Sequence, residues 1–526
     1  MNERHPADTR TVTILPEKRT IAATPGDNLL AILADHGILL RSDCGGKGVC
    51  GKCLVELVGD GGPALAAPAC SCTVTEDMAI VIPPGSLVPP HIVDKAEIFL
   101  PSSFQQAALA AEDSLGIAVD LGSTTIAVYL VDRAARRVLS SLAVKNPQSL
   151  HGDDVMSRIG YVGDQAERLA RLQRLTCGAI LWAVDALTAR AAPRRLLPAA
   201  MVIVGNPTMI HILLGVSPAS IGISPYEPQF FSARNSDAAT LGLGAVAATV
   251  RTLPQISGFI GGDILAAAIA TELTGQPPGT LLIDLGTNGE LLLKGEDGFY
   301  ATSCATGPAF EGAAISCGMQ AMPGAIERIA IDARQRPSPS TIAPGSGTAV
   351  APQGICGSGI VSGIAAMLAR GVINHSGALA RILPEGLEGQ RDGVRTYRIH
   401  REASGEEIAI SQKDVRQVQL GKAALISGID FLLARAGIAK PTRVLVAGAF
   451  GSHLDKRDLL TLGMLPPLPP EDIVMVGNAA GSGAVMVLCD PGYVKQAEEL
   501  AARTTVINLA ADPLFQEHFI TRLSFP

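Results

Sequence analysis

The sequence lacks the features that would assign the protein to a membrane or to nucleic acid. No block of Lys and Arg interrupts its mixed charges, and the formal net charge is −7, so nucleic acid is not an expected partner. The first ten residues, MNERHPADTR, contain no apolar signal-peptide core, and every long apolar run is broken by Asp, Gly or Pro before it could span a bilayer. We therefore expect a cytoplasmic protein that does not enter the membrane.

Charged residues are also few, at 17% against 47% hydrophobic residues. With this balance the chain is globular, and its 526 residues are too many for one hydrophobic core. Length alone predicts three or four domains. Strands and helices alternate along most of the chain, which indicates an α/β fold.

The ten cysteines are unevenly distributed, because five of them lie between residues 44 and 72. Such a cluster favours a ligand site over a disulfide framework. The glycine-rich segment CGGKGVCGKC carries Cys44, Cys50 and Cys53, and Cys70 follows after sixteen more residues. Three thiolates from a glycine-rich loop and a fourth from a later strand suit a 2Fe-2S cluster.

The fourth ligand stays open between two cysteines. Cys70 and Cys72 are two residues apart, and in a strand both thiols would face the same side. A hairpin over residues 11–23 and a helix over 27–36, capped by Thr24, precede the cysteine loop. This order resembles the 2Fe-2S ferredoxin fold, and Ala69-Cys70 resembles the end of the motif in related domains, which favours Cys70. A structural zinc site is the other interpretation, but the spacing is not that of a zinc knuckle.

A second pattern occurs twice, as an apolar strand that ends in Asp, a glycine turn and another apolar strand. Residues 117–130 read IAVDLGSTTIAVYL, and residues 279–293 read GTLLIDLGTNGELLL. Such a turn leaves N–H groups for an anion, and the Asp can hold a hydrated cation. Two copies predict similar domains facing each other across a nucleotide cleft. The candidate residues are Asp120, Gly122, Ser123, Thr124 and Thr125 in the first hairpin and Asp284, Gly286, Thr287, Asn288 and Gly289 in the second.

A third glycine turn, with Gly448 and Gly451, follows an apolar strand in VLVAGAFGSHLD at residues 444–455. Two phosphate hairpins followed by this turn resemble the superfamily of actin, sugar kinases and heat-shock chaperone ATPases. The resemblance implies a two-lobed ATPase core built on duplicated RNase H-like subdomains. It also implies that the adenosine approaches the backbone at the two glycines.

These patterns together predict an α/β protein with an N-terminal β-grasp-like 2Fe-2S ferredoxin domain, a linker and an actin/sugar-kinase-like ATPase core. The expected boundaries are 1–90 for the ferredoxin-like domain, 91–115 for the linker, 116–252 for the first lobe and 253–526 for the second lobe. Within the first lobe, a helix from about residue 153 is expected to carry Val155, Met156 and Ile159 on one apolar face.

The whole arrangement resembles one family, the reductive activators of corrinoid proteins. The resemblance rests on CGGKGVCGKC, IAVDLGSTT, NPQ with Asp154 and Arg158 nearby, LLIDLGTNGE, ATGPAFEG and LVAGAFGSHLD. It implies that ATP drives the reduction of a Co(II) corrinoid to Co(I), with a 2Fe-2S cluster, ATP and Mg²⁺ as cofactors. The implied partner is a corrinoid protein or a corrinoid-dependent methyltransferase. An external electron donor would reload the cluster, and a homodimer is compatible with the pattern.

The expected roles follow from this resemblance and from the chemistry of the turns. Asp120 and Asp284 would hold hydrated Mg²⁺ and orient the attacking water, and the hairpin hydroxyl and amide groups would bind phosphate. The expected cluster ligands are Cys44, Cys50, Cys53 and Cys70. Two alternatives are a small-molecule kinase with an appended redox domain and a simple electron carrier. Retention of both Asp residues and all three glycine turns weighs against the carrier.

Overall fold

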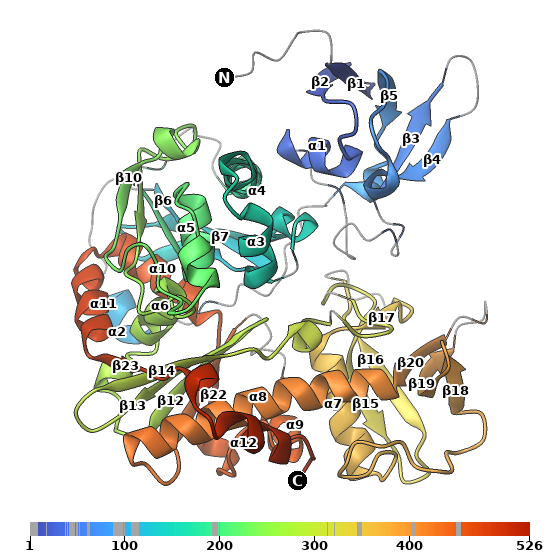
Figure 1. Ribbon diagram of the computed structural model, residues 1–526, viewed down its shortest axis with the longest axis vertical. Coiled ribbons are helices and arrows are strands. Elements are labelled where there is room, and N and C mark those ends of the chain that lie inside the picture. The colour runs from blue at the N-terminus through green and yellow to red at the C-terminus, as the bar shows by residue number, and fades with distance from the viewer. Residues whose placement is uncertain are drawn as a thin grey trace.

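The computed structural model contains three sheet-based regions in chain order, shown from blue to red in Figure 1. It describes residues 9–16, 18–36, 38, 40, 48, 51, 53–59, 64–87, 98, 100–106, 115–152, 154–191, 198, 200–312, 314–319, 321–344, 350–401, 405, 407–448 and 454–526. Within these ranges no helix is long and apolar enough to cross a bilayer. Most of the expected linker, and the loop that carries Cys44 and Cys50, lie outside the described residues.

The N-terminal region is a five-stranded sheet packed against one helix. Its strands are β1 (Arg10–Leu15), β2 (Arg19–Ala23), β3 (Leu54–Val58), β4 (Leu65–Pro68) and β5 (Met78–Val81), with helix α1 (Leu29–Asp35) and the short 3-10 helix η2 (Ala69–Ser71). The strand order is β2-β1-β5-β3-β4, and the neighbours are antiparallel except for parallel β1 and β5. This β-grasp-like arrangement confirms the expected fold.

Helix α1 begins later than the sequence suggested, and the predicted cap at Thr24 is wrong. The Asn28 side chain caps the helix by accepting a hydrogen bond from the Ala31 N–H at 3.3 Å. Thr24 instead donates its backbone N–H to the Asp27 carboxylate. An Asn at this position satisfies one of the free N–H groups of the first turn. The apolar face that it starts packs on the sheet.

The first lobe is built on a six-stranded sheet in the order β10-β11-β9-β6-β7-β8. Its strands are β6 (Leu115–Leu121), β7 (Thr125–Asp132), β8 (Arg137–Lys145), β9 (Ala200–Gly205), β10 (Asn235–Asp237) and β11 (Thr249–Thr252); its helices are α3 (Val155–Val162), α4 (Ala166–Ala191) and α5 (Pro207–Leu213), and α2 (Ser102–Gln106) precedes it. The first hairpin of the sequence pattern is therefore β6 and β7, as predicted.

The second lobe repeats this topology in the order β22-β21-β12-β13-β14-β23. The sheet and its helices are β12 (Thr280–Leu285), β13 (Gly289–Lys294), β14 (Phe299–Cys304), β21 (Arg443–Ala447), β22 (Ile473–Gly477), β23 (Thr504–Val506), α6 (Gly262–Ala270), α8 (Gln412–Ala436), α10 (Ala479–Cys489), α11 (Gly492–Ala502) and α12 (Phe515–Thr521). In both sheets three consecutive strands are antiparallel, and a fourth strand lies parallel to the first of them. This fourth strand is β9 beside β6 and β21 beside β12. The expected duplication is confirmed.

An insertion between β14 and β21 extends the second lobe. It contains β15 (Ala325–Ile331), β16 (Pro337–Thr341), β17 (Gly354–Ile355), α7 (Gly357–Ala369), β18 (Glu388–Arg391), β19 (Val394–Arg401) and β20 (Glu407–Ser411), and α9 (Lys456–Thr461) follows β21. The strands form two three-stranded sheets, β16-β15-β17 and β18-β19-β20. Helix α8 runs from this insertion to the main sheet in Figure 1.

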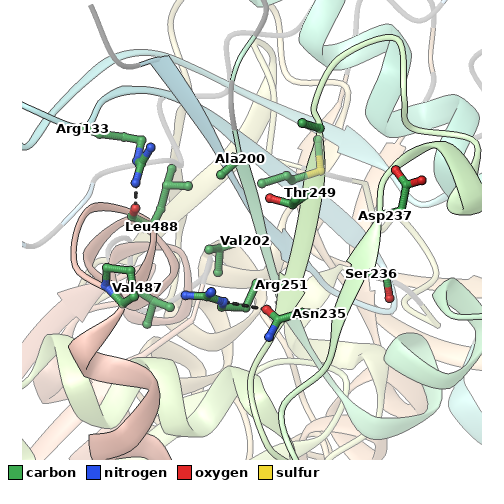
Figure 2. Close-up of a pocket in the computed structure, with 13 residues that line it drawn as sticks. Arg133, Ala200, Val202, Asn235, Ser236, Asp237, Thr249, Arg251, Val487 and Leu488 are labelled. Carbon is green, nitrogen blue, oxygen red and sulfur yellow. Dashed lines mark hydrogen bonds between the residues drawn. The ribbon is translucent and has the colours of Figure 1, made fainter. Parts of the chain in front are cut away.

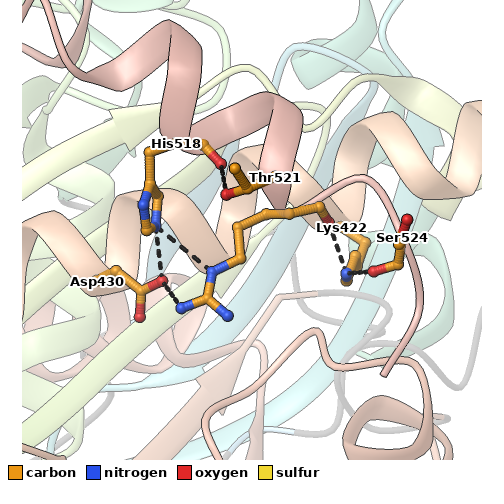
Figure 3. Close-up of polar contacts among 6 residues, drawn as sticks. Lys422, Asp430, His518, Thr521 and Ser524 are labelled. Atoms are coloured by element: carbon orange, nitrogen blue, oxygen red, sulfur yellow. Dashed lines mark hydrogen bonds and ion pairs between the residues drawn. The ribbon is translucent and has the colours of Figure 1, made fainter.

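The C-terminal helix α12 is fastened onto α8 (Figure 3). The Asp430 carboxylate of α8 lies 2.9 Å from His518 Nε2 and 2.6 Å from Arg522 Nη2. Lys422, only 3% exposed, donates to the carbonyl oxygens of Arg522 and Ser524 at 2.6 Å each. These contacts close the outer side of the second lobe and hold α8 in place under its sheet.

The two lobes share one apolar core, which includes Tyr129 and Val204 from the first and Leu282 and Val485 from the second. Helices α6 and α10 cross inside this core. At the crossing, a Cβ on Gly483 would overlap the carbonyl oxygen of Ala266. The helices therefore touch through their backbones, and only glycine fits at position 483.

We predict that Gly483→Ala destabilises the protein by about 3 kcal/mol or more, because the added methyl overlaps a backbone atom that cannot rotate away. Gly178→Ala in the middle of α4 is the matched control, since a Cβ there meets no atom within 4 Å. Alanine favours a helix over glycine by up to about 1 kcal/mol, so this control should keep or raise the thermal midpoint. Equal midpoints for the two variants would contradict the described crossing.

Candidate nucleotide site and cysteine turn

The turns of the two hairpins meet between the lobes. The hydroxyl oxygens of Thr124 and Thr287, 163 residues apart in the chain, are separated by 2.9 Å. Thr287 also donates to the Glu311 carboxylate at 2.9 Å. Because a hydroxyl carries one proton, Thr124 must donate to Thr287. The structure thus brings together the phosphate-binding residues that the sequence predicted in each lobe.

The carbonyl groups of the first turn are all held from outside the turn. Asn146 donates its side-chain amide to Gly122 O at 2.9 Å and its backbone N–H to Thr124 O at 2.8 Å. Arg158, fully buried, donates to Ser123 O at 2.5 Å. A peptide plane carries its N–H opposite its C=O. The turn is therefore preorganised, with its carbonyl oxygens already paired and not available to repel an anion.

The second turn is held in the same way by a different residue. Thr306 donates its hydroxyl in a shared bond to Gly286 O at 3.2 Å and Thr287 O at 3.1 Å. Inside the turn, the Gly286 N–H donates to Asn288 O at 3.0 Å, and in the first turn the Gly122 N–H donates to Thr125 O at 3.0 Å. The two turns are similar but not identical: Leu121 pairs with Ile126 and Leu285 with Gly289, so the first turn is one residue longer than the second.

Four carboxyl groups lie close enough at the cleft to perturb one another. Burial and neighbouring carboxylates raise the pKa of Asp120 to about 7 and that of Asp284 to about 8. Burial also raises the pKa of Asp263 to about 6 and that of Glu290 well above its usual value. Glu290 is the cross-strand partner of Asp284. Such a cluster favours a cation or shared protons, because like charges in a poorly hydrated space repel each other.

Three of the residues around this cluster were missing from the sequence prediction. Asp263 lies in the first turn of α6, and its only sequence signal is GGD ahead of an apolar helix. Asn478 caps α10 and donates to Asp120 Oδ2 at 2.9 Å and Tyr129 OH at 2.9 Å. Asn478 thereby links the second lobe to the catalytic candidate of the first. Arg158 was noted as part of a motif, but nothing in the sequence indicates its contact with Ser123.

Gly448 ends β21 directly beside the second hairpin. Its φ is +107°, and a Cβ would overlap Leu285 O and lie 3.1 Å from Asp284 Oδ1. Only glycine fits this conformation at such a close approach. The turn that the sequence predicts for adenosine binding therefore begins next to Asp284. Gly451 lies outside the described residues.

Cys53 lies just before β3, and Cys70 lies just after β4. We call these two segments together the cysteine turn. The Ala69 N–H donates to Cys53 O at 2.8 Å, so the segments that carry Cys53 and Cys70 are adjacent. Gly48 lies at the same place, because a Cβ on this residue, at φ +77°, would lie 3.5 Å from Ser71 Oγ. Cys53 and Cys70 carry thiols and not disulfides. These residues fit the thiolate donor set of a 2Fe-2S cluster, while Cys44 and Cys50 lie outside the described residues.

The strand expected at Cys70 and Cys72 is wrong. Residues 69–71 form η2, and Cys72 is its C-terminal cap, so the two thiols do not share a strand face. The Cys72 thiol donates to Pro68 O at 3.3 Å, and burial raises the pKa of Cys72. A thiol that is used as a donor and resists ionisation is a poor thiolate ligand.

A cavity between the first-lobe sheet and the C-terminal end of α10 is separate from this cleft (Figure 2). Its volume is about 540 Å³, and it is lined by residues that include Arg133, Ala200, Asn235, Arg251 and Leu488. Ala200 starts β9, whereas Gly205 ends the strand opposite Leu121. A strand of this length spans about 17 Å. The cavity thus lies at the opposite end of the sheet from the hairpin turns.

Among the described residues, no group of three or more His, Cys, Asp or Glu side chains has metal-binding geometry.

Comparison with known proteins accounts for all three regions. Residues 12–75 match the 2Fe-2S iron-sulfur cluster binding domain, residues 115–276 the RACo middle region, and residues 279–526 the C-terminal domain of RACo, the ASKHA domain. The chain is 32% identical over 444 residues to the corrinoid activation enzyme RamQ of Eubacterium limosum, covering 81% of this chain and 72% of that relative.

Two further relatives agree. The chain is 28% identical over 292 residues to the [Co(II) methylated amine-specific corrinoid protein] reductase of Methanosarcina barkeri, covering 52% of this chain and 51% of the relative. A solved reductive activator for a corrinoid, iron-sulfur protein superposes with a TM-score of 0.73 and 26% identity, and the match covers 98% of both chains. Sequence, fold and site thus lead to one conclusion: the chain belongs to the family of reductive activators of corrinoid proteins.

Proposed function

We propose that this protein uses ATP to drive the transfer of one electron to the cobalt of a corrinoid protein or corrinoid-dependent methyltransferase, converting Co(II) to Co(I). The observation that carries the proposal is the 2.9 Å contact between Thr124 and Thr287. It joins two duplicated phosphate hairpins in a chain that also carries a ferredoxin-like domain. The relatives named for corrinoid activation support the same function.

The nucleotide would lie across the two turns. We assign phosphate binding to residues of both turns, namely Gly122, Ser123, Thr124, Thr125, Gly286, Thr287, Asn288 and Gly289, and the approach of the adenosine to Gly448 and Gly451. Asp120 and Asp284 would hold hydrated Mg²⁺ and orient the attacking water. Their raised pKa values support this role, because a cation removes the repulsion that burial creates. When bound, MgATP supplies the free energy of hydrolysis for closure of the lobes.

The electron would come from the cysteine turn. We assign Cys44, Cys50, Cys53 and Cys70 as cluster ligands. When bound, a plant-type 2Fe-2S cluster supplies one electron at about −400 mV. The Asn28 side chain donates to Cys70 O at 2.7 Å, which fixes the backbone of that ligand. An external donor would then replace the electron that passes to cobalt.

The size of the nucleotide effect is sufficient for such a reaction. A ligand that binds one state about 10⁴-fold more tightly than another supplies about 5.5 kcal/mol. At about 59 mV for each tenfold change in a one-electron equilibrium, this corresponds to roughly 240 mV. Coupling to the nucleotide can therefore move an apparent potential well below that of the ferredoxin-like domain alone.

The direct test is anaerobic mixing of the protein with a Co(II) corrinoid protein, MgATP and a chemical reductant, while the Co(I) absorbance is followed. We expect Co(I) to form with ATP and not with a non-hydrolysable analogue. Equal Co(I) formation without nucleotide would support a simple electron carrier, and a phosphorylated metabolite in place of free phosphate would support a kinase.

For the cluster, we predict that Cys70→Ser abolishes the 2Fe-2S absorbance and that Cys72→Ser retains it, because the Cys72 thiol is occupied by Pro68 O. Both variants change one sulfur to oxygen at neighbouring positions, so each controls for the other. Iron and sulfide content of the purified proteins provides an independent measurement. Loss of the cluster in Cys72→Ser with retention in Cys70→Ser would reverse the ligand assignment.

For the nucleotide site, we predict that Asp284→Asn lowers ATP turnover at least about a hundredfold, as expected for loss of a group that positions charge at the reaction. The same variant should be more stable than the wild type at pH 8 without nucleotide. A carboxyl whose pKa rises on folding keeps its proton where the unfolded chain has lost it, so its stability contribution declines as pH rises from about 4 to about 8.

Thermal midpoints at pH 5 and pH 8, with turnover measured on the same preparation, check both parts. The advantage of Asp284→Asn over the wild type should shrink at pH 5. Asp297→Asn, at an exposed turn between β13 and β14, is the control and should change neither quantity. A folded Asp284→Asn protein with normal ATP-dependent Co(I) formation would rule out the assigned role.

A further inference from the structure

The ferredoxin-like domain makes a polar contact with the first lobe through α1 and α4, which lie side by side in Figure 1. Asp35, the last residue of α1, lies 3.1 Å from Arg171 of α4. Leu150, in the turn before α3, packs against the apolar cores of both regions. Through this contact, a conformational change in the ATPase core can reach the segments that carry Cys53 and Cys70.

The contact leaves buried polar atoms without partners. Asp35 Oδ1, Arg171 Nε and His151 Nε2 are all buried with no hydrogen bond. Burial raises the pKa of Asp35 in spite of Arg171, and burial together with Arg171 and Arg158 lowers the pKa of His151 to about 4. Asp35 and Arg171, which face each other across the contact, would regain water if the domain moved away. Docking therefore carries a free-energy cost, the lost hydration of these atoms, and separation of the domain would remove it.

One buried residue connects this contact to the first phosphate turn. Arg158 donates to Ser123 O, to Gln148 Oε1 at 3.2 Å and to Gly152 O at 3.1 Å. Gln148 in turn donates to Leu172 O and Thr176 Oγ1 on α4, at 3.2 and 2.6 Å. The segment 148–152, which includes Leu150 and His151, is thus held between the phosphate turn and α4.

The geometry of one peptide group makes this connection sensitive to phosphate. The C=O of Ser123 and the N–H of Thr124 belong to the same plane. A phosphate that binds the N–H adds a second attachment to this plane, on the side opposite the bond from Arg158. Any displacement of the plane toward the phosphate must carry the Arg158 guanidinium with it or stretch its bond to Ser123.

We propose that Arg158 is a positioning residue that makes docking of the ferredoxin-like domain depend on the nucleotide, so that phosphate at the Ser123–Thr124 peptide shifts segment 148–152 and releases the domain from α4. This inference rests on the proposed function. The released unit includes the cysteine turn, because Asn28 and Leu29 at the start of α1 donate to Cys70 O and Cys72 O at 2.7 and 2.9 Å. Nucleotide binding would thus free the electron-carrying domain to approach its partner.

Thermodynamic linkage gives the test. If nucleotide weakens docking, then weaker docking must tighten nucleotide binding by the same factor. In the full-length protein we expect Asp35→Asn to lower the Kd for the non-hydrolysable analogue AMPPNP about fivefold or more. Glu76→Gln, an exposed carboxylate on the same domain, should leave the Kd unchanged. Amide hydrogen exchange in α1 should rise when AMPPNP is added to the wild type.

The role of Arg158 is measured by a double-mutant cycle. In an Arg158→Lys background, AMPPNP should still bind, but Asp35→Asn should no longer change the Kd and α1 exchange should no longer respond. A merely structural Arg158 would lower stability and leave the effect of Asp35→Asn intact. Because Arg158 is buried and its variant can fail to fold, the comparison of Asp35→Asn with Glu76→Gln stands on its own.

The outcomes separate the two proposals. Failure of the wild type to bind AMPPNP would overturn the proposed function, and this inference with it. Normal binding with an unchanged Kd in Asp35→Asn, together with α1 exchange that ignores nucleotide, would overturn nucleotide-controlled docking and leave the proposed function standing.

Discussion

The crowding of carboxyl groups between the lobes is the constraint on which the rest of the site depends. Asp120, Asp284 and Glu290 lie on the two duplicated hairpins, and their pKa values rise because water cannot reach them well. Buried carboxyl groups that face one another are unfavourable when charged, so such groups keep their protons or pair with a cation. The surrounding hydrogen bonds from Asn146, Thr306 and Asn478 keep the site in place in spite of that cost.

Buried polar groups without full compensation also occur where the ferredoxin-like domain meets α4. Domains that move relative to each other have small, polar interfaces more often than large apolar ones. The contact around Asp35 and Arg171 is of this kind: among the described residues it has one ion pair, the apolar side chains of Ala34 and Leu150, and several unsatisfied atoms. By contrast, the two lobes share a continuous apolar core. The structure thus joins the lobes firmly and the electron carrier weakly.

The sequence predicted what depends on local pattern and missed what depends on packing. The duplicated hairpins and the turn at Gly448 were predictable, because alternating apolar residues and a glycine after an apolar strand are visible in consecutive residues. The orientation of α3 was not: Met156, expected on the apolar face, is 45% exposed, while Arg158 is fully buried. Periodicity places charges outward, and only the carbonyl oxygens of distant turns explain a buried guanidinium. The 3-10 turn at Cys70 failed for the same reason, since the Ala69 N–H bonds to Cys53 O, sixteen residues earlier. The cap of α1 failed on a local choice between Thr24 and Asn28.

The crossing of α6 and α10 limits how the lobes can move, because α10 packs on β6 and β9 of the first-lobe sheet and α6 contacts β12 and β13 of the second. Backbones that touch at Gly483 and Ala266 leave no layer of side chains over which one helix could slide. A change in the angle between the lobes must therefore be a rotation with its axis near that contact. In a rotation, displacement grows in proportion to distance from the axis, as in a lever. For the same angle, the outlying sheets β16-β15-β17 and β18-β19-β20 would therefore move further than the hairpin turns. Closure of the cleft would thus produce its largest displacement at these two sheets of the second lobe.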